Sequence, residues 1–101
     1  MTFSADCLQI VVGSIYRLRE TDDTQIRLAK TVIVHELYDN MALKNDIGII
    51  LLKNELDETE FIESVVLPMK RPKSGMQCIT LGWGRIYGVS GANKLIFAAK
   101  C

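Results

Sequence analysis

A run of apolar residues that follows a single acidic residue constrains this chain more than any other feature. The stretch 45–53 reads Asn-Asp-Ile-Gly-Ile-Ile-Leu-Leu-Lys and is rich in β-branched isoleucine. A short, continuous apolar run of this kind predicts a strand that is buried on both faces. A carboxylate at the entrance of such a strand is costly to bury unless it is paired or hydrogen-bonded. Asp46 is therefore the first candidate for a functional residue.

The rest of the chain has the pattern of an all-β protein. Short apolar or alternating stretches, separated by turn-rich segments that hold both prolines, predict strands at 8–13, 25–34, 46–53, 77–83 and 94–100. There are no internal repeats, and such a series of short strands favours an all-β fold. Within 25–34, the alternation predicts one shared face, made up of Ile26, Leu28, Val32 and Val34. His35 then continues the opposite face.

Composition fits one globular domain and argues against several classes of function. Of the 101 residues, 49% are hydrophobic, and 12 basic residues balance 12 acidic ones. The zero net charge provides no overall field to recruit nucleic acid or anionic lipid. No stretch of 18 apolar residues is present to form a membrane-spanning helix, and the residues after Met1 do not form a signal peptide. One histidine and three scattered cysteines match no metal site, so we expect neither a metal nor a cofactor.

The stretch 45–53 resembles the strand that carries the catalytic aspartate of trypsin-like and chymotrypsin-like serine proteases, where Asn-Asp-Ile-Ala-Leu precedes further apolar residues. Other landmarks of that family follow in the same order. Residues 1–7 are similar to the family's Thr-Ala-Ala-His-Cys turn, and residues 32–38 are similar to its strand that ends in His and Tyr. Leu67-Pro68 resembles the end of its linker, and residues 75–84 resemble its element of Gly, Cys and Gly-Trp-Gly. The resemblance covers the whole chain.

The resemblance implies a partial trypsin-like double β-barrel, within one incomplete peptidase domain spanning residues 1–101. Residues 1–68 would supply later strands of the N-terminal barrel. Residues 69–101 would supply the linker and the first hairpin of the C-terminal barrel. An interrupted barrel leaves strand edges and apolar interior open to water, so we expect the chain alone to be aggregation-prone or loosely packed.

The resemblance places Asp46 at the position of the triad aspartate, but its two partners are missing. Asp6 occupies the position of the catalytic histidine, and a carboxylate with an ordinary pKa of about 4 cannot exchange a proton near neutral pH as imidazole does. Only 55 residues follow Asp46, whereas the serine of the template triad lies about 93 residues beyond its aspartate. Ser90, in Gly-Val-Ser-Gly, comes nearest but lacks the Gly-Asp-Ser-Gly-Gly context and is interpreted as a loop residue. His35, the only histidine, corresponds to a non-catalytic surface residue of the family.

The three cysteines are Cys7, Cys78 and Cys101. By resemblance, Cys7 and Cys78 would each pair with a cysteine that this sequence does not contain, and Cys101 has no clear counterpart. No CxxC motif is present, so a redox site is not expected.

Three functions stay open. The chain is a truncated or degenerate trypsin-like serine endopeptidase that is itself inactive, a noncatalytic protease homologue that serves as a protein-binding module, or a small β-domain for protein interaction without protease ancestry. The expected substrate or partner is a protein or peptide, and the resemblance implies an extracellular parent even though no signal peptide is seen. The specificity pocket would lie in the absent part of the second barrel, so substrate preference does not follow from this sequence.

Overall fold

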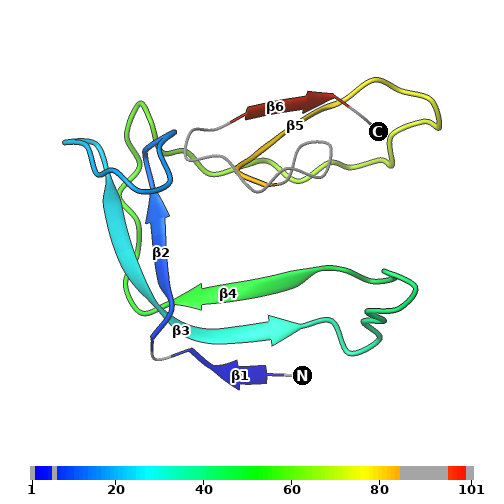
Figure 1. Cartoon of the computed structure of the whole chain (residues 1–101), viewed down its shortest axis with the longest axis horizontal. Coiled ribbons are helices and arrows are strands. Elements are labelled where there is room, and N and C mark those ends of the chain that lie inside the picture. Colours follow the sequence, from blue (N-terminus) through cyan, green and yellow to red (C-terminus); the bar gives the residue numbers. More distant parts are fainter. Residues whose placement is uncertain (1, 6, 85–95, 100–101) are drawn as a thin grey trace. The chain divides into compact units, whose positions relative to one another are not determined.

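The computed structural model describes residues 2–5, 7–84 and 96–99. These residues form six strands and no helix (Figure 1), which confirms the all-β class. The strands are β1 (Thr2–Ser4), β2 (Gln9–Val12), β3 (Gln25–Val34), β4 (Gly48–Leu52), β5 (Ile79–Gly82) and β6 (Ile96–Ala99). The sheets do not close on themselves within the described residues, as expected for part of a trypsin-like barrel.

β3 pairs with each of the other three strands of the larger sheet. Its first half pairs antiparallel with β2, and its second half pairs antiparallel with both β1 and β4. Ile33, for example, lies opposite Thr2 of β1 and Ile49 of β4. β3 is therefore a central strand. β4 is an edge strand among the described residues, since it pairs only with β3.

A β-bulge interrupts β3. Ala29 pairs with Leu52 and Thr31 pairs with Leu51, so Lys30 is an extra residue in the ladder. Bulges bend a strand and increase its twist, and Figure 1 shows β3 curving along its length. Because directly paired residues share a face of the sheet, the extra residue reverses the alternation. The prediction that Ile26 and Leu28 share a face with Val32 and Val34 is therefore wrong.

The segment that follows β4 is fastened to the start of β3 by side chains. The Gln25 amide donates to the Asp57 carbonyl at 2.9 Å, and its oxygen accepts the Asp57 N–H at 2.9 Å. Arg27 Nε donates to the Glu55 carbonyl at 2.7 Å, and its Nη2 lies 3.6 Å from the Asp57 carboxylate. These bonds continue the attachment of β4 to β3 beyond the end of the ladder.

Residues 1–12 and 25–57 form one compact unit, and residues 13–24 and 58–101 form a second. In the second unit, β5 pairs antiparallel with β6, and Trp83 Nε1 donates to the Ile15 carbonyl at 2.9 Å. Gly13 has a φ of +83°, and a Cβ at this position would lie 2.3 Å from the Asp23 carbonyl oxygen. The turn after β2 therefore requires glycine. The proposed boundary near residue 68 stays a prediction.

Few apolar side chains are fully buried. Among the described residues, the buried apolar side chains are those of Ala5, Ala29 and Ile62. Ile49, Ile50 and Leu51 of β4 are 57%, 44% and 46% exposed, so the prediction of a strand buried on both faces is wrong. The physical reason is that a barrel strand is covered only once the barrel closes, and the described strands leave their sheet open. No helix in the described part of the chain is long and apolar enough to span a membrane.

Candidate active site

Asp46 lies two residues before β4, where the β3–β4 ladder opens. The register pairs Val34 with Gly48, and the His35 N–H donates to the Ile47 carbonyl at 3.2 Å, which continues the pairing by one residue. Asp46 is exposed. Water therefore solvates its carboxylate, and the burial cost that singled out this residue in the sequence does not arise.

The connection between β3 and β4 is ordered by its own hydrogen bonds. The Asp39 carboxylate accepts the N–H groups of Met41 and Ala42 at 2.9 and 3.1 Å. The backbones of Asp39 and Lys44 exchange two hydrogen bonds of 3.0 and 3.1 Å. Asn45 has a φ of +53°, a conformation that asparagine tolerates better than most residues. Its side-chain amide donates to the Leu37 carbonyl at 2.9 Å, so Asp46 follows a locally fixed turn.

His35 is close to Asp46 in the ladder but is not arranged as a triad histidine. Its Nδ1 accepts the Leu37 N–H at 3.0 Å. A neutral imidazole whose Nδ1 is an acceptor carries its proton on Nε2. In a Ser-His-Asp triad the proton is on Nδ1 and is donated to the aspartate. His35 therefore has the opposite tautomer, which supports its interpretation as a surface residue.

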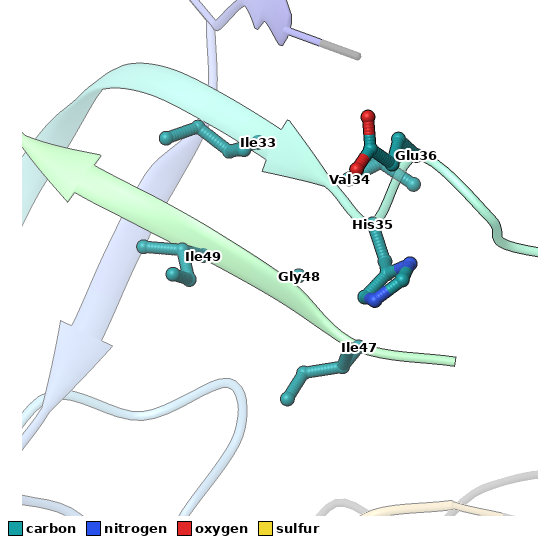
Figure 2. Close-up of a pocket in the computed structure, with 7 residues that line it drawn as sticks. All are labelled: Ile33, Val34, His35, Glu36, Ile47, Gly48 and Ile49. Atoms are coloured by element: carbon teal, nitrogen blue, oxygen red, sulfur yellow. The ribbon is translucent and has the colours of Figure 1, made fainter. Parts of the chain in front are cut away.

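An open depression of about 430 Å³ lies where β3 ends and β4 begins. Figure 2 shows the residues that line it: Ile33, Val34, His35, Glu36, Ile47, Gly48 and Ile49. The lining is mostly aliphatic. The Glu36 carboxylate points away from the His35 ring in this view, so the two polar side chains do not form an acid–base pair. Sequence reasoning did not single out Glu36, because nothing in the pattern distinguishes it from other surface acids.

The other predicted site residues are only partly accounted for. Asp6, Ser90 and Cys101 lie outside the described residues, so their expected roles stay predictions. Cys7 is an exposed, free thiol. Cys78 is not a free thiol, which corrects the expectation that it too lacks a partner. Within the described parts of the chain, no three potential ligands gather into a group that could hold a metal ion.

Comparison with known proteins connects this arrangement to one family. The family model Trypsin matches residues 3–96. Mannan-binding lectin serine protease 1 of Rattus norvegicus is 30% identical over 77 residues, which are 76% of this chain and 11% of that protein. Trypsin II-P29 of Gallus gallus is 30% identical over 78 residues, 76% of this chain and 31% of that protein. Chymotrypsin-2 of Vespa crabro is 37% identical over 60 residues, 58% of this chain and 28% of that protein.

The chain thus spans less than a third of the length of each of these relatives. The matched region includes the Asn-Asp-Ile strand and the Gly-Trp-Gly element. Motifs, strand content and family match agree, and the chain belongs to the trypsin family of serine proteases.

Proposed function

We propose that this chain derives from a trypsin-like serine endopeptidase and that the 101-residue polypeptide does not cleave peptide bonds. The observation that carries the proposal is the hydrogen bond from the Leu37 N–H to His35 Nδ1, at 3.0 Å. Because the Nδ1 atom of His35, the one histidine in the sequence, accepts this bond, it has no proton to donate to Asp46 as a triad histidine would. The sequence supports the same conclusion, since Asp6 stands at the histidine position and no serine has the Gly-Asp-Ser-Gly-Gly context. Peptide-bond cleavage by acyl transfer to a serine needs both a general base and an activated nucleophile.

The test uses the purified chain with fluorogenic arginyl and phenylalanyl peptides and a fluorophosphonate that labels activated serines. We expect no labelling and no turnover above that of the buffer. The matched controls are the Asp46→Asn and His35→Ala variants, which remove the two candidate catalytic groups one at a time. Turnover by the original chain that either variant abolishes would overturn the proposal.

For the parent protein, we infer proteolysis of protein or peptide substrates in an extracellular setting. The family membership of the chain supports the reaction class. We also infer the domain organisation expected from the motifs, with barrel strands in 1–68 and the linker and a second hairpin in 69–101. Limited proteolysis tests this organisation: first cleavage between residues 68 and 76 agrees with it, and first cleavage between β2 and β3 contradicts it.

A noncatalytic protein-binding role is the second candidate, and the β3–β4 connection favours it. Leu37, Met41 and Leu43 are 68%, 90% and 70% exposed on a loop that its own hydrogen bonds order. A preordered apolar loop loses little conformational entropy when it binds a partner. In a binding assay against an immobilised protein inhibitor of serine proteases, Leu43→Asp should abolish binding, whereas Leu18→Asp, at a position 73% exposed, should not. Equal binding by the two variants would exclude this loop as the contact.

A further inference from the structure

Charged residues are distributed unevenly along this chain. All 12 acidic residues lie between Asp6 and Glu63, whereas residues 64–101 hold six basic residues and no acidic one. The zero net charge therefore results from an acidic segment followed by a basic one. Such an asymmetry between two parts of a sequence points to a polyanionic partner for the basic part.

The basic residues are densest in the loop that precedes β5. Residues 68–76, which we call the basic loop, read Pro-Met-Lys-Arg-Pro-Lys-Ser-Gly-Met and are yellow in Figure 1. Lys70, Arg71 and Lys73 are all exposed, and no carboxylate of the described residues pairs with them. Neighbouring cations without a counter-charge repel one another, so an anion bound among them relieves this repulsion.

The backbone of the basic loop is constrained around these cations. Pro72 fixes its own φ and restricts Arg71 to extended conformations. The Met76 N–H donates to the Lys73 carbonyl at 3.1 Å, and Gly75 has a φ of +82°, as in a type II turn. The loop curves round an open depression of about 870 Å³ that its own residues line. No distant segment is therefore needed to form the depression.

The three cations are close enough to act on one ligand. A chain advances at most about 3.6 Å per residue, so the Cα atoms of Lys70 and Lys73 are no more than about 11 Å apart. This separation is near the Debye length of about 8 Å at physiological ionic strength, so the fields of the cations add. A basic run of this density is typical of patches that bind heparin or nucleic acid.

The composition of the basic loop distinguishes between these two polyanions. Single-stranded nucleic acid is held by aromatic side chains on which its bases stack, as well as by cations. The basic loop contains no aromatic residue. A polysaccharide that carries sulfate groups needs only the cations, because sulfate oxygens accept charge-assisted hydrogen bonds from lysine and arginine. The loop therefore fits a sulfated polysaccharide better.

We propose that the basic loop is a binding site for a sulfated polysaccharide, held by Lys70, Arg71 and Lys73. The choice of a polysaccharide rests on the extracellular setting inferred above for the parent protein. Detection of the parent protein in culture medium tests that setting, whereas the binding experiments use the purified chain, so the two proposals can fail separately.

Isothermal titration calorimetry with a heparin octasaccharide tests the site. Lys70→Ala/Lys73→Ala should raise the Kd at least about tenfold. Lys30→Ala/Lys44→Ala removes the same charge at two exposed positions outside the basic loop and should change the Kd less than about twofold. Heparosan, which carries carboxylates but no sulfates, should not bind. No binding of the octasaccharide, equal weakening by the two double variants, or equal binding of heparosan would each overturn the proposal.

The salt dependence of the Kd reports how many cations contact the ligand. Each cation that displaces a counterion adds close to one to the slope of log Kd against log salt concentration. The slope should therefore be lower by about 2 in Lys70→Ala/Lys73→Ala than in the original chain. An unchanged slope would show that these lysines do not contact the polysaccharide.

Lysine acetylation read by mass spectrometry locates the site on the unmodified chain. With heparin at about ten times its Kd, Lys70 and Lys73 should be acetylated about tenfold more slowly, and Lys30 and Lys44 at an unchanged rate. Equal protection of all four lysines would contradict a site in the basic loop. Equal protection of Lys70 and Lys73 by single-stranded DNA or by phosphatidylserine vesicles would overturn the assignment to a polysaccharide.

Discussion

Arg27 is expected to hold the segment after β4 against β3, and the stability it contributes follows from its contacts. Replacing it with alanine removes the 2.7 Å bond from Nε to the Glu55 carbonyl and the 3.6 Å ion pair with Asp57. It also removes the bonds from Nη1 to the Ile26 carbonyl at 3.0 Å and from Nη2 to the Gln25 side-chain oxygen at 3.2 Å. A hydrogen bond from a charged donor contributes about 1.5 to 3 kcal/mol. The Asp57 side chain is 85% exposed, so solvent screening limits the ion pair to less than about 1 kcal/mol. The two bonds from the terminal nitrogens add about 1 kcal/mol together. Alanine recovers about 1 to 2 kcal/mol of side-chain entropy, so the net loss is about 2 kcal/mol.

The assay for this loss is native-state amide hydrogen exchange at Lys53, whose N–H donates to the Leu28 carbonyl at 2.8 Å. A loss of about 2 kcal/mol raises the exchange rate about 30-fold when the amide exchanges through opening of this unit. The Trp83 indole N–H, bonded to the Ile15 carbonyl in the other compact unit, is the internal control and should not change.

Two further variants separate the hydrogen bond from the charge. Asp57→Asn removes only the screened ion pair and should raise the exchange rate less than about fivefold. Arg27→Lys keeps the charge but loses the planar donor group, so its effect should lie between those of the other two variants. An Asp57→Asn effect as large as that of Arg27→Ala, or an Arg27→Ala effect below about threefold, would refute the reasoning.

Two other predictions concern the second unit. Gly13→Ala should lower the free energy of unfolding by at least about 2 kcal/mol, because the φ there is +83° and the new Cβ would lie 2.3 Å from the Asp23 carbonyl oxygen. Gly75→Ala is the control: its φ is +82° but nothing lies within 4 Å of the new Cβ, so the loss should be only about 1 kcal/mol. Urea unfolding followed by Trp83 fluorescence measures both, and equal losses would contradict the clash. The side-chain and backbone hydrogen bonds from Ser64 lower the pKa of Glu58 in the folded chain. The stability that these bonds contribute is therefore fully present above the Glu58 pKa of the unfolded chain, and it is lost as the pH falls through the Glu58 pKa of the folded chain. Carboxylate NMR should show the Glu58 pKa rise in Ser64→Ala, and an unchanged pKa would contradict this cause.

Strand positions were largely predictable from the sequence. β3 has the predicted bounds, and the other four predicted strands occur inside their expected ranges, although residues 94, 95 and 100 of the last range lie outside the described residues. β1 was missed because three residues are too few to show an alternation. Thr2–Ser4 is a strand because it pairs with residues 31–33 of β3, which are distant in sequence.

The sequence predicted where Asp46 lies relative to a strand, but not its exposure to solvent or the hydrogen bonding of His35. The motif singled out Asp46, and the structure has it two residues before β4, while its catalytic position stays a prediction. Its exposure and the hydrogen bond that sets the His35 tautomer could not be inferred, because both depend on the path of the connection between β3 and β4.

By itself, the sequence determined the all-β class, the approximate strand positions and the trypsin-family resemblance, because alternation and short motifs are local properties of the chain. Only the tertiary structure decided that β4 has exposed apolar side chains, that a bulge at Lys30 reverses the alternation of β3, and that the His35 Nδ1 atom accepts a backbone N–H instead of donating to an aspartate. An apolar run indicates that a strand should be covered, but burial depends on which distant segments pack against it. Here the described strands leave the sheet open, so the side chains of Ile49, Ile50 and Leu51 stay partly exposed.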